Sequence, residues 1–221
     1  MWKEKLKIIP YGIDKELKVD ITQLQEIKNK YNLENKDVIT FFGSIRPNKG
    51  VEYLISSFSK VIKKKNNLVL LIAGSAPKMW SEYFNELKRL VKDLKIEGCV
   101  RFTGFVSNND IPAILCISKI IVLPYTQSTQ SGVLYHEVIP FNKPVIVTDV
   151  EGISETVKKY NIGMIVQPKD VRSLTNVMLD FLDNPKKFNK NMRNVERIKK
   201  QYSWNNVAHL HKKIYKTTKH G

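Results

Sequence analysis

Residues 126–155 read TQSTQSGVLYHEVIPFNKPVIVTDVEGISE, and this stretch joins a polar turn, a helical pattern and a buried strand. The turn contains Gly132 and leads into a helix that carries Glu137, and the apolar run Val145–Thr148 ends just before Asp149. A turn of this kind presents unpaired backbone N–H groups at the positive end of a helix, which suits the phosphates of a nucleotide. A glutamate on the first turns of that helix can accept two hydrogen bonds from vicinal hydroxyls such as those of a ribose. The stretch therefore predicts a strand, turn and helix that bind a nucleotide.

The rest of the chain repeats this alternation of strand and helix. Short apolar runs rich in β-branched residues alternate with amphipathic segments, a pattern typical of β/α units around a parallel sheet. After Asp170, which suits a helix N-cap, the pattern is helical to the end. We therefore expect an α/β fold, a Rossmann-like doubly wound parallel sheet with a C-terminal helical tail, whose ligands bind at the carboxyl ends of the strands. The expected strands are Leu6–Ile9, Val38–Gly43, Leu68–Ala73, Val100–Thr103, Ile120–Leu123, Val145–Thr148 and Met164–Val166.

The composition indicates a folded, strongly basic protein. The 221 residues are 42% hydrophobic, enough for one large α/β domain or at most two small ones. Lys and Arg number 37 against 21 Asp and Glu, which gives a formal net charge of +16. This surplus favours anionic partners, namely nucleic acid, an anionic membrane surface or phosphorylated substrates. The alternative is that clusters such as Lys63–Lys65 are solvated helix ends without a partner.

The cysteine and histidine spacings indicate neither a metal site nor redox chemistry. Cys99 and Cys116 are far apart and are expected to be two buried thiols in a reducing compartment. The histidines of the basic tail, His209, His211 and His220, do not form a metal set. The amino-terminal segment does not resemble a signal peptide, and no run approaches the roughly 18 apolar residues of a membrane span. We expect a cytoplasmic protein, at most peripheral to the membrane, that uses neither a metal nor a cofactor.

A second stretch, FFGSIRPNKG at 41–50, places two cations beside the start of a helix. An apolar strand runs into Gly43, the loop supplies Arg46 and Lys49, and Gly50 opens the helix. Arg can neutralise a diphosphate through paired N–H contacts, and Lys can do so as a point charge. The stretch is neither a Walker A nor a GxGxxG motif, and the alternative is that both residues are ordinary loop charges.

Read together, the two stretches resemble the donor-sugar half of the retaining glycosyltransferases of family 4, which have the two-domain GT-B fold. Members of this family carry a basic pair in the first loop that binds the donor diphosphate. The commoner version has Arg directly after Gly, where this chain has Ser44, and residues 43–50 are similar to the variant Gly-x-Ile-Arg-x-x-Lys-Gly. The resemblance implies that Arg46 and Lys49 are the catalytic residues, because they would stabilise the departing diphosphate.

A second family signature is a pair of glutamates that spans a loop and the start of a helix. The second glutamate corresponds to Glu137, which by resemblance binds the donor ribose, and the first corresponds to Thr129. Thr129 and Gln130 still offer hydrogen-bonding groups in place of the missing carboxylate. The turn of Gln130, Ser131, Gly132, Val133 and Leu134 resembles an alternative in which backbone amides meet the β-phosphate and the sugar.

Shorter matches extend the resemblance over nearly the whole chain. Gly43 ends one expected strand and Gly74 follows the next, and both are expected to lie against the donor. The stretch 102–106 is similar to the loop whose backbone meets the base, so Phe105 and Val106 are expected there. Ser203 and Trp204 begin a segment like the family's C-terminal helix.

The resemblance also implies a domain organisation. Residues 1–221 are expected to form a single nucleotide-sugar-binding domain, with a hinge-like opening strand over 1–14 and a mainly helical tail over 170–221. In the GT-B fold the acceptor site belongs to an N-terminal domain. We expect this acceptor domain to be absent from the sequence, and a partner chain is one possible source of it.

The implied activity is metal-independent transfer of a hexosyl group, with retention, from a nucleoside diphosphate sugar to an unknown acceptor in polysaccharide or glycoconjugate biosynthesis. No protein nucleophile is evident in the sequence. One alternative is a nucleotide-sugar-binding module that is inactive without an acceptor-domain partner. Another is a basic nucleic-acid-binding protein, but the sequence has no helix-turn-helix, zinc finger or aromatic RNA-binding strand, so no specific nucleic acid is expected. The expected partners are a nucleotide sugar, an acceptor-domain chain and an anionic membrane touched peripherally.

Overall fold

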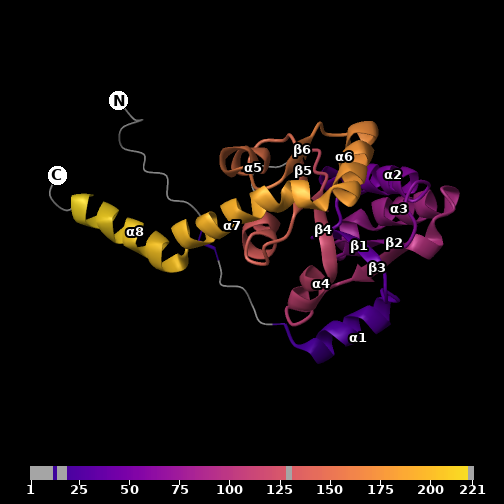
Figure 1. Ribbon diagram of the computed structural model, residues 1–221, viewed down its shortest axis with the longest axis horizontal. Helices are drawn as coiled ribbons and strands as arrows, with labels where there is room; N and C mark the ends of the chain where they lie inside the picture. Colours follow the sequence, from indigo (N-terminus) through magenta and orange to yellow (C-terminus); the bar gives the residue numbers. More distant parts are fainter. Residues whose placement is uncertain (1–11, 14–18, 128–130, 219–221) are drawn as a thin grey trace.

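The computed structural model describes residues 12–13, 19–127 and 131–218. Within these ranges, parallel strands form a six-stranded sheet in the order β3-β2-β1-β4-β5-β6 (Figure 1). The strand order reverses between β1 and β4, which confirms the doubly wound α/β fold expected from the sequence. The expected strand at Leu6–Ile9 lies outside the described residues. The strands are β1 Asp37–Phe42, β2 Leu68–Ala73, β3 Val100–Gly104, β4 Ser118–Leu123, β5 Val145–Thr148 and β6 Met164–Val166.

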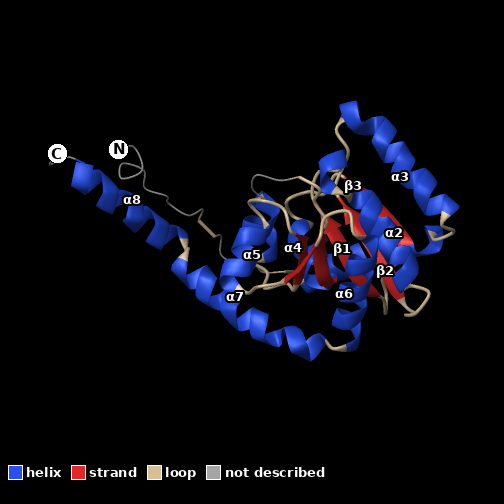
Figure 2. Ribbon diagram, turned by 90° about the horizontal axis from the view of Figure 1, so that it is seen from above, coloured by secondary structure: helices blue, strands red, loops and turns tan. Residues whose placement is uncertain are grey.

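Alternate residues of the central strand enter two separate cores on opposite faces of the sheet. Ile39 and Phe41 of β1 belong to one buried cluster, whereas Val38 and Phe42 belong to the other. Since helices cover both faces, the strands are mostly apolar instead of alternating regularly with polar residues (Figure 2). The first cluster includes residues of α2 Val51–Val61, α3 Ser81–Asp93, α5 Ser154–Tyr160 and α6 Val171–Asp183, and the second includes residues of α1 Ile21–Tyr31 and α4 Ile111–Ile117.

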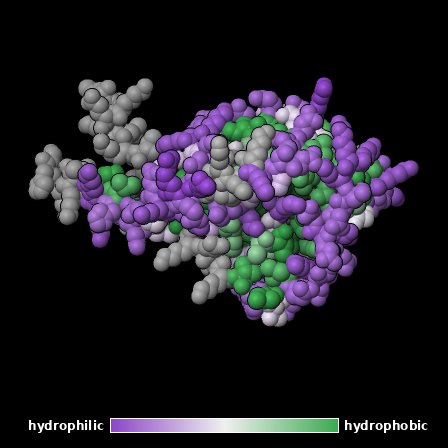
Figure 3. All heavy atoms as spheres, in the orientation of Figure 1, coloured by the Kyte–Doolittle hydropathy of each residue, from purple (hydrophilic) through white to green (hydrophobic). Residues whose placement is uncertain are grey.

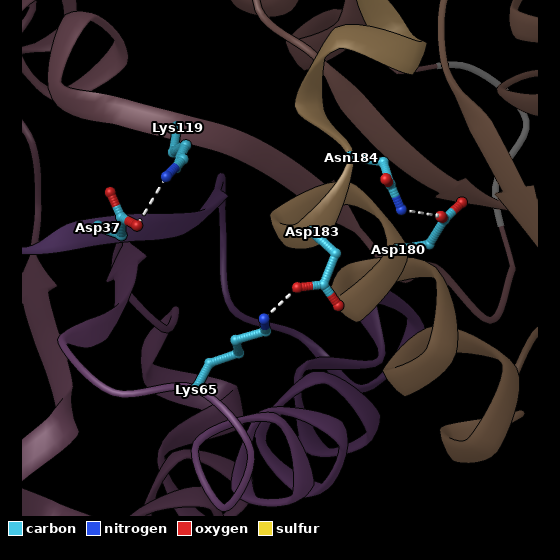
Figure 4. Close-up of polar contacts among 6 residues, drawn as sticks. All are labelled: Asp37, Lys65, Lys119, Asp180, Asp183 and Asn184. Atoms are coloured by element: carbon cyan, nitrogen blue, oxygen red, sulfur yellow. Dashed lines mark hydrogen bonds and ion pairs between the residues drawn. The ribbon is translucent and has the colours of Figure 1, made fainter.

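Ion pairs connect neighbouring elements at the edge of the sheet where the strands begin (Figure 4). Lys119 Nζ on β4 lies 2.6 Å from Asp37 Oδ2 on β1. Lys65, which follows α2, pairs with Asp183 at the end of α6. These side chains are partly exposed, so each pair contributes about 1 kcal/mol or less to stability. The loops that carry the candidate site lie at the other edge, where the strands end.

The described chain after β6 is mainly helical. The short 3-10 helix η6 Pro185–Phe188 follows α6, and α7 Asn189–Gln201 and α8 Trp204–Thr218 complete the tail. In both views α8 projects away from the sheet (Figures 1 and 2). The amide of Ile13 donates to the carbonyl of Tyr202 at 2.8 Å. The described part of the hinge-like segment therefore lies at the junction of α7 and α8.

The visible face of the molecule is mostly hydrophilic, with an apolar area over α4 and the start of α1 (Figure 3). The expectation of two buried thiols is wrong, because Cys116 is exposed and Cys99 is only half-buried. The cause is that α4 packs Ala113 and Ile114 against the sheet, which leaves Cys116 in its last turn facing solvent. In the described ranges, no helix has both the length and the apolar character needed to cross a membrane.

Candidate functional site

Glycines form the floor of the site at the carboxyl ends of β1, β2 and β3. Gly43, Gly74 and Gly104 have φ angles of +130°, +148° and +70°. The amide of Gly43 donates to the carbonyl of Ala73 at 2.9 Å. A Cβ on Gly74 would lie 1.9 Å from the carbonyl oxygen of Gly43, so only glycine allows the two backbones to pass this closely. The floor of the site is therefore backbone without side chains, which permits close approach of a ligand.

The loop after β1 brings two cations to the start of α2. Ile45 is fully buried and its amide donates to the carbonyl of Ser75 at 3.0 Å, which anchors the loop. Arg46 is exposed, and its Nε donates to Ser44 Oγ at 3.1 Å. Lys49 ends the 3-10 helix η2 Pro47–Lys49, and α2 begins two residues later. Both predicted cations thus lie beside the positive end of an 11-residue helix.

Gly50 lets this loop lie directly against the end of β4. Its φ is +63°, and a Cβ there would lie 2.1 Å from the carbonyl oxygen of Pro124. The amide of Thr126 donates to the carbonyl of Asn48 at 3.0 Å, and Asn48 Nδ2 donates to the carbonyl of Gln127 at 3.5 Å. Strands β1 and β4 flank the reversal in strand order, which is where open α/β sheets bind ligands.

Lys49 is partly buried on the face of an aromatic ring. Its Nζ lies 3.6 Å from the centroid of Tyr125, the second residue after β4. Burial, and then the neighbouring Arg46, lower the pKa of Lys49 to about 8. Burial raises the pKa of Tyr125 to about 12, and the nearby Glu137 carboxylate acts in the same direction. The Tyr125 phenol therefore stays protonated at neutral pH, while the charge of Lys49 is unusually easy to lose.

The predicted phosphate-binding turn lies on the other side of Tyr125. Ser131 is buried, and its Oγ lies 3.5 Å from the Tyr125 hydroxyl. The amide of Leu134 donates to the carbonyl and to Oγ of Ser131, at 3.1 and 3.3 Å. Val133 faces the end of β1, because its Cγ2 would lie 3.4 Å from a Cβ on Gly43. Gly132 is exposed, whereas Thr129 and Gln130 lie outside the described residues.

Glu137 lies on a π-helical turn, Leu134–Val138, that follows Ser131. Its side chain is half-buried and its Oε2 atom is fully buried. The wider π turn is often found at functional sites. The next strand supports this region, since Thr148 Oγ1 at the end of β5 donates to the carbonyl of Tyr125.

The loops after β2 and β3 form the remaining side of the site. The amide of Gly74 donates to Thr103 Oγ1 at 3.1 Å. Phe105 is 81% exposed, so its ring is available to a ligand, whereas Val106 is buried. Across the described part of the chain, no group of three or more His, Cys, Asp and Glu side chains is arranged to hold a metal ion.

The structure thus brings most of the predicted residues to one edge of the sheet. Arg46, Lys49, Ser131 and Glu137 surround the ends of β1 and β4, and Gly74 and Phe105 lie on the β2 and β3 side. Sequence reasoning placed Tyr125 after a strand at this edge but assigned it no role in the site. The available signal was an aromatic residue just after the buried strand Ile120–Leu123, at an edge where small or polar residues are more common.

Comparison with known proteins places the chain in a family. The family model described as "Glycosyl transferases group 1" matches residues 23–201. The chain belongs to this family. Among curated relatives, it is 24% identical over 160 residues to the alpha-D-kanosaminyltransferase of Streptomyces kanamyceticus, covering 72% of this chain and 40% of the relative. The group 1 chain therefore spans less than half the length of that relative.

Solved structures share the fold of this group 1 chain. HepE of Anabaena in complex with UDP and glucose has a TM-score of 0.81 at 21% identity, covering 96% of this chain and 56% of HepE. The C-terminal domain of a glycosyl transferase group 1 family protein, LpcC, from Francisella tularensis has a TM-score of 0.73 at 22% identity. That match covers 87% of this chain and 97% of the Francisella domain. These likenesses confirm the GT-B type of α/β fold.

Proposed function

We propose that this chain is the nucleotide-sugar-binding part of a retaining, metal-independent glycosyltransferase. The donor would be a nucleoside diphosphate sugar, and a hexosyl group would pass to an acceptor. The observation that carries the proposal is the placement of Arg46 and Lys49 at the start of α2, opposite the turn that leads to Glu137. Family membership supports the reaction class, and HepE, which shares the fold, was solved in complex with UDP and glucose.

In this proposal, each part of the site would have a separate task. The amino end of α2, Arg46 and Lys49 would bind the diphosphate, and their charge would count most as negative charge grows on the departing diphosphate. Glu137 would accept hydrogen bonds from the ribose hydroxyls. The turn at 131–134 would hold the β-phosphate and sugar next to the glycine floor. The residues in these roles bind and orient the donor, and none of them is assigned as a nucleophile.

The acceptor half of the reaction would come from outside these 221 residues. The chain spans 56% of HepE and 40% of the kanosaminyltransferase, so both proteins have long regions with no counterpart in this sequence. We propose that an acceptor domain completes the site, either in the same polypeptide or on a partner chain. The net charge of +16 would favour an anionic acceptor or a peripheral contact with an anionic membrane.

Calorimetric titration with UDP, GDP, ADP and TDP tests the proposal. At least one nucleoside diphosphate should bind to the wild-type chain. Lys49→Ala should weaken that binding by about tenfold or more, because a charge-assisted contact to phosphate contributes roughly 1.5–3 kcal/mol. The matched control is Lys60→Ala, which removes the same charge from the exposed far end of α2. Equal losses in both variants, or no binding by the wild type, would contradict the proposal.

A further inference from the structure

Tyr125 is held by groups from three different parts of the site. Its side chain is fully buried, although it lies beyond the end of β4 at the ligand-binding edge. Its ring contacts Lys49 from the loop after β1, its hydroxyl contacts Ser131, and its carbonyl accepts from Thr148 on β5. Tyr125 thus joins the loop that carries Arg46 and Lys49 to the turn that leads to Glu137.

The ring of Tyr125 gives the charged ammonium group of Lys49 a favourable partner. Among the described residues, no carboxylate pairs with Lys49, and Arg46 repels it. Burial and Arg46 both favour loss of the proton. The electron-rich face of a tyrosine acts in the opposite direction, because it attracts an ammonium group, most strongly where water is excluded. At 3.6 Å from the centroid, the contact is close enough to hold Nζ in one position.

We propose that Tyr125 is a positioning residue for the donor: its ring keeps Lys49 charged and aimed at the diphosphate, and its hydroxyl fixes the turn that carries Glu137. The inference rests on the proposed function of the site. Ser131 provides the second half of the link, because it contacts the Tyr125 hydroxyl and also accepts the amide of Leu134. One buried side chain thus sets the distance between the phosphate-binding and ribose-binding groups.

The pH dependence of donor binding separates this role from a purely structural one. The charged groups that act on this pair are Arg46 on Lys49 and Glu137 on Tyr125. Above a pH of about 8 the free protein loses the Lys49 charge, so the affinity for UDP should fall as the pH rises. The phosphates of UDP stay fully ionised over this range, since their last pKa is about 6.

The decisive comparison is Tyr125→Leu against Tyr125→Phe, with UDP titrated between pH 6.5 and 10. Tyr125→Phe keeps the ring, so the alkaline decline in affinity should stay where the wild type has it. Tyr125→Leu removes the ring, so the decline should move to lower pH by roughly 0.5 to 1.5 pH units, and affinity at neutral pH should fall about threefold to thirtyfold. Lys49→Met should abolish the decline and weaken binding throughout.

The wild-type protein provides a test that does not depend on the folding of Tyr125→Leu. Lysines methylated with carbon-13 give one NMR signal each, and the Lys49 signal is identified by its absence in Lys49→Met. A methylammonium on the ring of Tyr125 should resonate upfield of the other lysines, and UDP should move it.

Each outcome bears on a different part of the inference. An unshifted Lys49 signal, or the same alkaline decline in wild type, Tyr125→Phe and Tyr125→Leu, would overturn the role of Tyr125 while leaving the diphosphate site intact. Unchanged UDP binding in Lys49→Met would instead overturn the proposed function, and the role of Tyr125 with it.

Discussion

In the proposed site, two side chains of opposite charge would select the ligand, one on each side of the strand ends. Lys49 offers a cation on the β1 side, where burial and Arg46 lower its pKa to about 8. Glu137 offers a carboxylate on the β4 side, and its Oε2 atom is buried in the π-helical turn. A ligand that satisfies both must be anionic at one point and rich in hydroxyl donors at another. A nucleoside diphosphate sugar has both properties, and the exposed Phe105 adds an apolar face that suits a base.

The role of Glu137 can be tested through the ribose hydroxyl that it would read. Wild-type protein should bind UDP more tightly than 2′-deoxy-UDP, by roughly fivefold or more, because a hydrogen bond to a charged acceptor contributes about 1.5–3 kcal/mol. Glu137→Gln keeps the shape but removes the charge, so the preference should shrink. Exposed Glu155, on α5, provides the control Glu155→Gln, which should keep the wild-type preference. Equal affinity of the wild type for both nucleotides would rule out this role.

At the residue level, the sequence motifs predicted where the candidate site residues lie in the fold better than which side chains contact each other. Arg46, Lys49 and Glu137 were assigned from their spacing to strands and glycines, and the structure places all three at one edge of the sheet. Their contact with a donor stays a prediction. The contact between the Tyr125 ring and Lys49 was not predictable, because the two residues lie far apart in the sequence. Such a contact depends on the packing of β1 beside β4, which no local pattern encodes.

At the element level, the buried strands were the easiest part to predict. The expected bounds of Leu68–Ala73, Val145–Thr148 and Met164–Val166 agree with β2, β5 and β6. Helix α1 was not predicted, since its sequence ITQLQEIKNKY is mostly polar and buries only Ile27. Capping residues define the ends of α1 instead. The side chain of Asp20 accepts a hydrogen bond from the amide of Thr22, and Asn32 ends the helix in the left-handed conformation.

The close contact between Gly43 and Gly74 gives a prediction about how the ends of β1 and β2 pack together. Gly74→Ala should destabilise the protein by about 1–3 kcal/mol or more, because a Cβ would overlap the Gly43 carbonyl at 1.9 Å and the φ of +148° is unfavourable for alanine. Urea unfolding should show a lower midpoint with an unchanged slope. UDP binding should also weaken, since Gly43 must move.

The control for this prediction is Gly98→Ala. A Cβ on Gly98 meets nothing within 4 Å, so the change in stability should stay within about 0.5 kcal/mol. If Gly74→Ala were as stable as Gly98→Ala, the close contact between the ends of β1 and β2 would not exist in solution.

At the level of the whole molecule, the net positive charge is concentrated in the C-terminal tail. After Asp183 the sequence contains eleven Lys and Arg residues and a single acidic residue, Glu196. Much of this charge lies on α7 and α8, and α8 projects away from the domain (Figure 1). Composition predicted an anionic partner but could not locate the charge, because location depends on how the tail leaves the fold. We expect the tail to contribute more than the donor loop to any salt-dependent attraction.

Catalysis by these 221 residues alone should be very slow, even with the donor bound. The chain should bind the matched donor but rarely transfer its sugar, because none of the described residues is assigned to hold an acceptor. Lost positioning of a second substrate removes several kcal/mol of barrier reduction, up to about 7–11 kcal/mol in ideal cases. A glycosyl-transfer assay with the matched donor and acceptor, with and without an acceptor-domain chain, measures this directly. The rate should rise by orders of magnitude when the partner is added, and Lys49→Met should abolish that rise, whereas Lys60→Ala should preserve it. Efficient turnover by the chain alone would show that a complete active site lies within it, and the division into donor and acceptor halves would then be wrong.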